Sequence, residues 1–158
     1  MTNPGRDQRQ MHESYVQMAQ LVMPNDTNPY GTLSGGRLMH WIDIAGGISA
    51  MRHARQLVVT AAIDHFVFLV PIPEGFFVVL EARVTCSGRT SMEVKVDVAG
   101  EDPVTGKTSQ TTTARLVYVA IENGVSVEVP DLVPSTPDEK AIHAVSYTHL
   151  TLPTTPYV

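Results

Sequence analysis

From residue 57 onward, the chain places apolar residues at every second position over long stretches. The clearest runs are 78–86 and 92–98, in which Glu, Arg, Lys, Asp or Thr occupy most of the intervening positions. A period of two with one polar face predicts an antiparallel sheet that packs one face on a core. Short turns at 87–90 and 101–106 lead from these strands to a Thr-rich strand over 108–121.

Two further apolar stretches also predict strands. Residues 57–69 are rich in β-branched and aromatic side chains and end at a Pro-Ile-Pro-Glu-Gly turn. Residues 15–23 are apolar-rich and stop at Pro24, which predicts a first strand before a loop thick with Pro, Gly, Asn and Asp. The sheet is therefore expected to contain about five strands.

Between these strands, residues 37–55 follow a helical period. The apolar positions at helical spacing are Leu38, Ile42, Ala45 and Ile48. Ser34 is placed to cap the helix, and the basic residues near its end suit the negative pole of the helix dipole. Since no other helix is long enough to cover the sheet, the pattern predicts an α+β domain with one long helix against an antiparallel sheet.

Composition narrows the class of protein. The chain has 158 residues, 43% hydrophobic and 17% charged, which favours one folded domain over a disordered chain. Its net charge of −5 argues against a nucleic-acid-binding surface. The single cysteine, Cys86, excludes an internal disulfide and a Cys-rich zinc site, and it continues the apolar face of a strand, so we expect it in the core. With a polar start and only short apolar runs, we expect a soluble, cytoplasmic protein without a membrane partner.

The pattern divides the chain into four parts. Residues 1–13 are predicted to be a flexible N-terminal leader, and 14–133 to form the folded domain. Residues 134–145 are predicted to be a truncated C-terminal helix. Residues 146–158 contain no charged residue and resemble translated adapter sequence, so they are interpreted as a non-native tail.

One acid, Asp43, stands in the apolar middle of the predicted helix. At about 100° per residue, several small or polar residues fall within about 60° of it. These are Gly36, His40, Gly47 and Ala50. Because a buried unpaired carboxylate is costly, Asp43 is either a structural acid, paired with His40 or Arg37, or a residue kept for chemistry.

The start of this helix and the loop before it offer further polar groups. Gly35 and Gly36 can present backbone N–H groups to a ligand and could polarise a carbonyl as an oxyanion hole, although Gly-Gly is more often an ordinary junction. Asn25, Asp26 and Asn28 are common turn formers. The six histidines show no metal-ligand spacing, and no serine-hydrolase or Walker pattern is present.

In combination, these residues resemble the hotdog-fold acyl-CoA thioesterases of the YciA-like and brain acyl-CoA hydrolase group. The segment MPNDTNPYGTLSGGRLMHWIDIAGGISAMRHA contains a Pro-x-Asp-x-Asn loop, a Gly-Gly helix start and an acid seven residues later. The segments VVTAAIDHFVFLVPIPEG and GRTSMEVKVDV resemble the family's following strands. The likeness covers about residues 14–130 in unbroken order.

The resemblance implies a long central helix wrapped by a curved five- to six-stranded antiparallel sheet. It also implies a homodimer with active sites at the interface, which could assemble further into a tetramer or hexamer. Asp43 would activate water or attack the thioester directly, Asn28 would position water or substrate, and Gly36 would supply the N–H that polarises the carbonyl. No cofactor or metal is implied beyond coenzyme A as part of the substrate.

The resemblance also assigns a set of residues to coenzyme A. Those that fall where the family contacts this ligand are Gly35, Gly88, Arg89, Thr90 and Ser91. Two departures concern this contact: Val70 stands where the family often has a basic residue, and Phe76 where an Asp often follows the turn. They bear on coenzyme A anchoring and substrate preference more than on the chemistry.

Three functions remain open at this stage. The first is hydrolysis of acyl-CoA to a free fatty acid and coenzyme A. The second is a non-catalytic acyl-CoA-binding module, and the third is a hydratase or dehydratase, which needs a His paired with an acid. His40 lies one turn before Asp43, but the residues flanking it do not fit that third reading.

Overall fold

The computed structural model describes residues 6–64 and 66–150. One long and one shorter helix, two 3-10 turns and eight strands make up this part of the chain. The helices are α1 (Gly35–Ala54) and α2 (Pro137–Leu150), and the 3-10 turns are η1 (Met11–Ser14) and η2 (Pro24–Asp26). The strands are β1 (Gln8–Gln10), β2 (Val16–Leu21), β3 (Val58–Ile63), β4 (Phe77–Ser87), β5 (Ser91–Glu101), β6 (Thr108–Glu122), β7 (Val125–Ser126) and β8 (Asp131–Val133).

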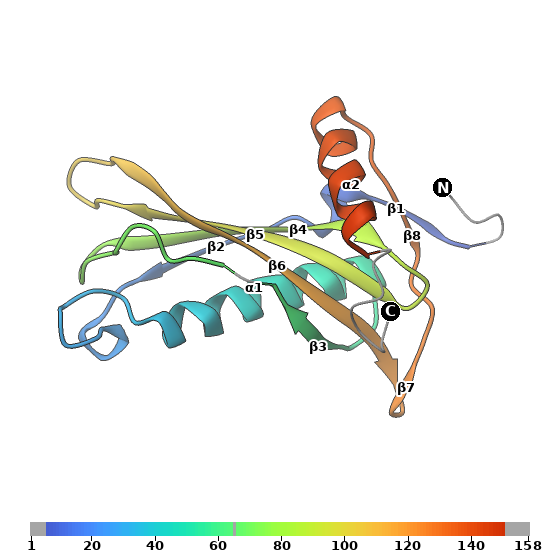
Figure 1. The fold of residues 1–158 in the computed structure, drawn as a ribbon, viewed down its shortest axis with the longest axis horizontal. Coiled ribbons are helices and arrows are strands. Elements are labelled where there is room, and N and C mark those ends of the chain that lie inside the picture. Colours follow the sequence, from blue (N-terminus) through green and yellow to red (C-terminus); the bar gives the residue numbers. More distant parts are fainter. Residues whose placement is uncertain (1–5, 65, 151–158) are drawn as a thin grey trace.

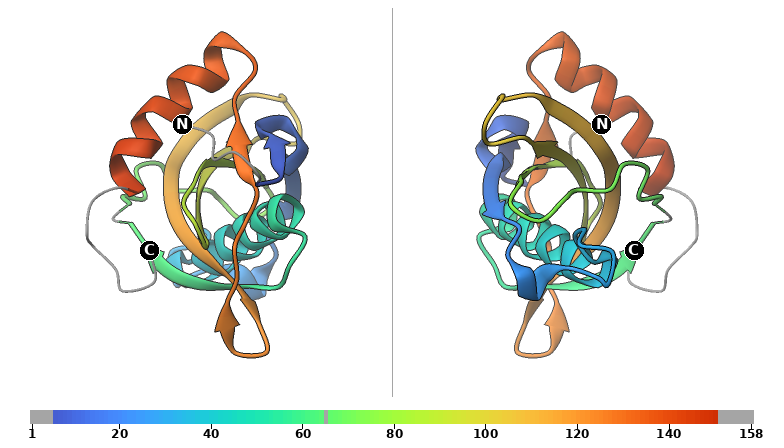
Figure 2. Two further views of the ribbon diagram at one scale, coloured as in Figure 1. Left: turned by 90° about the vertical axis from the view of Figure 1, so that its right-hand side faces the viewer. Right: turned by 90° about the vertical axis from the view of Figure 1, so that its left-hand side faces the viewer.

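A six-stranded sheet forms the main layer of the molecule. Its order is β2-β4-β5-β6-β3, with β7 paired to β6, and all of its pairings are antiparallel. The hairpins β4-β5 and β5-β6 form at the two turns that the sequence pattern predicts (Figure 1). The sheet curls into an arc with α1 inside the curve (Figure 2). The predicted α+β architecture of one long helix against a curved antiparallel sheet is therefore confirmed.

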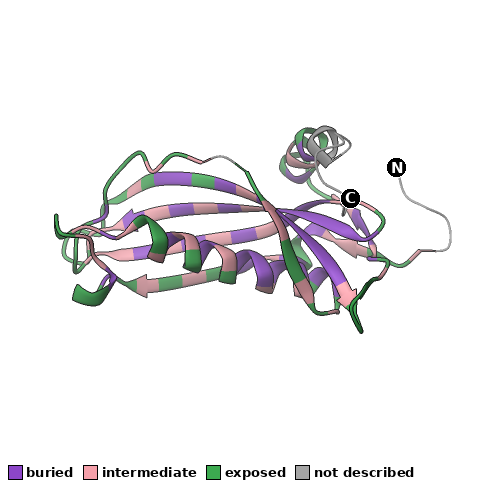
Figure 3. Ribbon diagram, turned by 60° about the horizontal axis from the view of Figure 1, so that its bottom comes forward, coloured by how far each residue is buried: buried purple, intermediate pink, exposed green. Residues whose placement is uncertain are grey.

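Helix α1 has the bounds and the cap that its residues predict, to within two positions. The Ser34 hydroxyl accepts a hydrogen bond from the Arg37 N–H at 3.2 Å. The helix ends at Arg55, which adopts a left-handed conformation with φ of 54°. Its buried side meets the buried positions of the strands, whose exposure alternates along each strand (Figure 3). The largest buried apolar side chains of this core include Leu38, Ile42, Leu80, Met92 and Leu116.

Cys86 is buried in a hydrophobic cluster, as predicted, but this cluster is separate from the main core. The register of β4 against β5 shifts between Val84 and Cys86, so that Cys86 lies opposite Glu93. Such a bulge inserts one residue and reverses the faces beyond it. Cys86 consequently packs with Val117 in a second small cluster. Burial raises the pKa of the Cys86 thiol to about 12, which keeps it protonated and poorly nucleophilic.

Part of the polar side of the sheet is buried. Glu93 is fully buried and pairs with Arg115 at 2.8 Å. It also accepts a hydrogen bond from the Thr85 hydroxyl at 3.0 Å. Arg115 in turn contacts the Ser146 hydroxyl of α2, which covers this part of the sheet. The alternation along β5 shows that one face is polar, but it does not show that a second helix covers that face.

The two ends of the described chain are more ordered than the pattern indicates. Residues 8–13, assigned to a flexible leader, form β1, which pairs in parallel with β8, and most of η1, in which Met11 is fully buried. Helix α2 continues past the expected boundary at residue 146 to Leu150. Residues 1–5 and 151–158 lie outside the described residues. Within the described ranges, no helix is both long and apolar enough to cross a membrane.

The C-terminal end of α1 contains a buried histidine whose charge state should affect stability. His53 is fully buried, and its Nε2 lies 2.8 Å from the Pro130 carbonyl oxygen, to which it donates. Its Nδ1 has no partner among the described residues. Burial lowers the pKa of His53 below its ordinary 6.5, only partly opposed by the bond to Pro130. The folded protein therefore holds this histidine in its neutral form.

We predict that the protein loses stability as the pH falls from 7 to 5, because the unfolded chain binds a proton at His53 that the folded chain excludes. His53→Gln keeps a donor for Pro130 but does not titrate. The difference in unfolding free energy between wild type and this variant should therefore change by on the order of 1 kcal/mol across that range. Urea denaturation at several pH values measures it. Parallel pH profiles for the two proteins would contradict the assignment.

Candidate functional site

Asp43 lies in the middle of α1, half-buried, and is held by two residues from neighbouring strands. The Thr60 hydroxyl of β3 donates to its Oδ1 at 2.8 Å. The Tyr118 hydroxyl of β6 lies 3.0 Å from the same oxygen and 2.9 Å from the Asp43 carbonyl oxygen. The carboxylate therefore has one fixed oxygen, whereas its Oδ2 has no hydrogen-bond partner within the described part of the chain.

The two donors reach Asp43 from adjacent strands. Thr60 and Tyr118 face each other across the β3-β6 pair, immediately before a register shift that leaves Ala61 unpaired. Burial and the neighbouring charge of Asp43 raise the pKa of Tyr118, so its hydroxyl stays protonated and serves as a donor. Sequence reasoning missed both residues, because nothing in the spacing of a Thr and a Tyr 58 positions apart indicates that they meet.

The structural pairings considered for Asp43 are not those observed. Arg37 pairs with Asp26, at 3.1 Å between Nε and Oδ1. His40 is exposed, and no hydrogen bond joins it to Asp43 within the described residues. Of the small residues predicted beside Asp43, Gly47 lies next to the Tyr118 ring, but the closest approach of that ring is at Gly46, which the predicted set did not include. The donors that order the carboxylate are neutral hydroxyls, and within the described residues no ion pair joins it to a cation.

Asn28 is held within its own loop, before the start of α1. Its Oδ1 accepts hydrogen bonds from the N–H groups of Tyr30 and Thr32, and its Nδ2 donates to the Thr32 hydroxyl at 2.9 Å. One hydrogen of Nδ2 remains for a ligand. Asn28 lines a cavity of about 190 Å³, here called the loop cavity. The other residues that line it are Thr32, Leu33, Gly35, Phe68 and Pro71.

The start of α1 presents an open backbone surface next to the loop cavity. A Cβ on Gly35 or Gly36 would meet no atom within 4 Å. Their N–H groups belong to the first turn, where a helix has no internal acceptor for them. From Gly36 to Asp43, however, seven residues at 1.5 Å each separate the two by about 10 Å along the axis. Within one chain, these N–H groups and the Asp43 carboxylate therefore cannot act on the same carbonyl.

The turn between β4 and β5 pairs with the residues of β6 that follow Tyr118, since Ser91 lies opposite Val119 and the Ala120 N–H donates to the Thr90 carbonyl oxygen. The Gly88 N–H donates to the Ser91 carbonyl oxygen at 2.8 Å, and the Arg89 side chain is exposed. Thr90 is 5% exposed and Ser91 is fully buried, so their hydroxyls are not free to contact a ligand in this arrangement. The carbonyl oxygens of Gly88 and Arg89 accept hydrogen bonds from the Arg6 side chain, which leaves the Arg89 side chain as the exposed group of the turn. Within the described residues, no three His, Cys, Asp or Glu side chains are grouped so that they could hold a metal ion.

Comparison with known proteins relates this arrangement to one family. The model of the thioesterase superfamily matches residues 30–107. The uncharacterised acyl-CoA thioester hydrolase YkhA of Bacillus subtilis is 45% identical over 132 residues, which is 83% of this chain and 77% of that protein. Several longer curated relatives also match, and the chain spans 22% to 35% of their length.

Two solved structures of similar proteins share the fold. An acyl-CoA hydrolase from Staphylococcus aureus, in complex with butyryl coenzyme A and coenzyme A, has a TM-score of 0.84 and 34% identity. The match covers 90% of this chain and 88% of that one. A hexameric acyl-CoA thioesterase has a TM-score of 0.88 and 36% identity, with 91% of this chain and 93% of that one covered.

The contact between Gly46 and Tyr118 provides a test of how Asp43 is held. A Cβ on Gly46 would lie 2.5 Å from the Tyr118 hydroxyl oxygen, closer than atoms can approach, whereas a Cβ on Gly47 would lie 3.8 Å from the ring. We predict that Gly46→Ala destabilises the protein by about 1–3 kcal/mol, because the ring must move.

Gly47→Ala is the matched control, and it should stabilise by up to about 1 kcal/mol, since alanine favours a helix. Urea denaturation of both variants measures the two effects. Equal unfolding free energies for the two variants would show that Tyr118 is not packed against Gly46.

Proposed function

The chain belongs to the thioesterase superfamily, and on that basis we propose that it hydrolyses acyl-CoA to a free fatty acid and coenzyme A. The observation that carries the proposal is the Asp43 carboxylate, fixed through Oδ1 by Thr60 and Tyr118 while Oδ2 remains available. A carboxylate held in this way is prepared to act on a water molecule or a carbonyl carbon.

The reaction adds the elements of water across the thioester. In the proposed mechanism, an oxygen nucleophile, either water activated by Asp43 or the carboxylate itself, attacks the carbonyl carbon. The carbonyl oxygen gains negative charge, which the N–H group of Gly36 stabilises at the helix start. The C–S bond then breaks, and coenzyme A leaves as the thiol, its sulfur protonated by the proton that the attacking water released. If the carboxylate itself attacks, the acyl group remains on Asp43 as a mixed anhydride, and a water molecule then hydrolyses it to the free acid, restores the carboxylate and supplies the proton for the sulfur. Asn28 contributes its remaining Nδ2 hydrogen to the position of water or substrate.

We further propose that each active site combines residues of two subunits. The axial separation of about 10 Å between Gly36 and Asp43 prevents one chain from supplying both groups to one carbonyl. Strand β3, which carries Thr60, is an end strand of the sheet and pairs only with β6. Leu57, Val59 and Ile63 on and beside it are 74%, 47% and 41% exposed. An apolar edge of this kind favours pairing with a second copy.

Coenzyme A would be anchored by Arg89. The protein has a net charge of −5 and the ligand carries phosphates, so a local cation is needed to attract it. The Arg89 side chain is exposed at the tip of its turn, and a guanidinium can hold a phosphate through two hydrogen bonds. Since Thr90 and Ser91 are buried and the Gly88 N–H is bonded to the Ser91 carbonyl, the guanidinium of Arg89 would hold the phosphate without their hydroxyls.

The alternative of a hydratase or dehydratase loses support. That chemistry needs a His near the acid, and His40 is exposed while Asp43 bonds to Thr60 and Tyr118. A binding module without catalysis needs no carboxylate ordered by two donors with one oxygen left available. The geometry around Asp43 therefore favours hydrolysis over both alternatives.

We predict that Asp43→Asn lowers kcat for acyl-CoA hydrolysis by about 10²–10⁴-fold, because the amide cannot accept the proton or attack the carbonyl. The change is nearly isosteric and keeps an oxygen for Thr60, so the fold should persist. Thiol release measures the rate. Asp97→Asn on β5 is the matched control and should retain wild-type activity. Near-normal turnover by Asp43→Asn would remove Asp43 from the mechanism.

We predict that mixing inactive Asn28→Ala and Asp43→Ala subunits restores part of the activity. If the two residues act at one site from different chains, a heterodimer contains one site with both residues intact. Co-expression with two affinity tags isolates that species, and the singly tagged variants are the controls. An isolated heterodimer as inactive as its parents would mean that each site is completed within one chain.

A further inference from the structure

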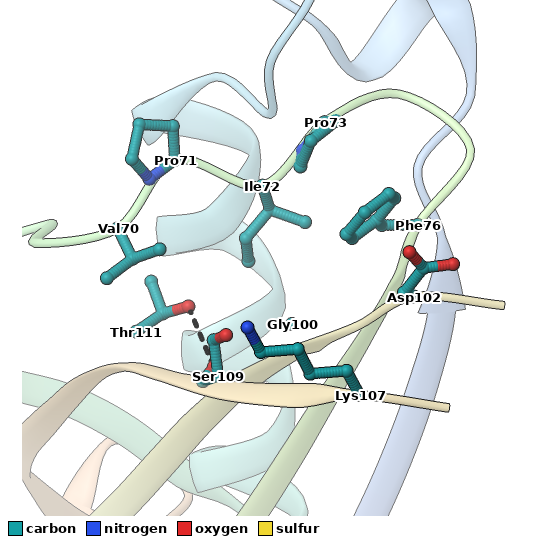
Figure 4. A pocket seen from close by; sticks show the side chains of 10 residues that line it. All are labelled: Val70, Pro71, Ile72, Pro73, Phe76, Gly100, Asp102, Lys107, Ser109 and Thr111. Atoms are coloured by element: carbon teal, nitrogen blue, oxygen red, sulfur yellow. Dashed lines mark hydrogen bonds between the residues drawn. The ribbon is translucent and has the colours of Figure 1, made fainter. Parts of the chain in front are cut away.

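A second cavity lies on the far side of Pro71 from Asn28. It has a volume of about 290 Å³ and is here called the hairpin cavity, because it faces the end of the β5-β6 hairpin (Figure 4). The hairpin forms one wall of this cavity. The opposite wall is the connecting segment, residues 66–76, which follows β3. The wall residues from this segment are all apolar: Val70, Pro71, Ile72, Pro73 and Phe76.

The hairpin cavity adjoins the loop cavity that contains Asn28. Pro71 lines both. Main-chain hydrogen bonds join the connecting segment to the loop that carries Asn28: the Leu33 N–H donates to the Ile72 carbonyl oxygen at 2.8 Å, and the Glu74 N–H donates to the Gly31 carbonyl oxygen at 3.0 Å. For a ligand at the helix start beside Asn28, Pro71 is therefore the residue that separates it from the hairpin cavity.

The chemistry of the hairpin cavity fits the end of a hydrocarbon chain. On its inner side, Ile72 is buried and points toward Gly100 of β5 (Figure 4). A Cβ on Gly100 would lie 3.2 Å from Ile72 Cγ1, so the Ile72 side chain packs against the bare backbone of Gly100 and closes the inner end of the cavity. The polar residues Asp102, Lys107 and Ser109 line the hairpin side of the cavity. A chain that extends past the apolar wall meets charged groups, which limits its length.

We propose that the hairpin cavity receives the distal methylene groups of the acyl chain, and that Ile72 and Gly100 together set the preferred chain length. This proposal rests on the proposed acyl-CoA hydrolysis. The thioester carbon lies at the helix start beside Asn28, and the acyl chain passes Pro71 into the hairpin cavity. Ile72 and Gly100 are specificity determinants and take no part in bond breaking.

The test compares kcat/KM over saturated straight-chain acyl-CoA substrates from butanoyl to hexadecanoyl. Ile72→Ala deepens the cavity and should raise the ratio of kcat/KM for long over short chains by about tenfold. Gly100→Val fills it and should lower the same ratio by about tenfold, since each methylene that a pocket accepts or rejects changes the rate by at least that factor. The two variants must move the ratio in opposite directions.

Matched controls separate this effect from loss of stability. Leu80→Ala removes a buried core side chain of the same size as Ile72, but Leu80 does not line the hairpin cavity. Val104→Ala changes the tip of the same hairpin, where the side chain is 91% exposed. Neither should change the ratio. If Ile72→Ala or Gly100→Val fails to fold by circular dichroism, Ile72→Val and Gly100→Ala should give smaller shifts in the same directions.

The outcomes distinguish this inference from the function on which it rests. If wild type hydrolyses no acyl-CoA of any length, the proposed function fails and the inference fails with it. If wild type is active and the folded variants keep its chain-length profile, the hairpin cavity does not hold the acyl chain and only this inference is overturned. A shift of equal size in Leu80→Ala would overturn it as well.

Discussion

The close approach of α1 to β6 is the constraint on which the rest of the site depends. At Gly46 the helix has no side chain, and the Tyr118 ring takes the place that a Cβ would occupy. That contact brings the Tyr118 hydroxyl to both the backbone and the carboxylate of Asp43. The same hydroxyl thus fixes the distance between helix and sheet and the orientation of the acid, so packing and chemistry cannot be altered separately.

The rigidity of the helix then sets the architecture of the active site. A straight α-helix holds Gly36 and Asp43 about 10 Å apart, whatever the loops do. This separation is the basis of the proposal that two helices complete one site, and β3 presents an apolar edge at an end of the sheet.

The sequence was most informative where a single period or motif decides the structure. Alternation over 92–98, the Ser34 cap and the helical spacing around Ile42 identified β5 and α1, and the resemblance to hotdog thioesterases is confirmed by the relatives found. The features that the sequence did not predict depend on contacts between segments that are distant along the chain. The expected strand over 57–69 ends at Ile63. The bulge that places Cys86 in a separate cluster from the main core is visible only in the register with β5. Similarly, Glu93 looks solvent-exposed until α2 covers it.

The hydrogen bonds between residues 31–33 and the connecting segment have a mechanical consequence. They tie the loop that carries Asn28 to the wall that carries Ile72, so these two segments move as one body on the surface of the sheet. Neither end of that body can be displaced without transmitting the displacement to the other. A molecule that pushes the wall outward at Ile72 therefore also shifts the amide of Asn28.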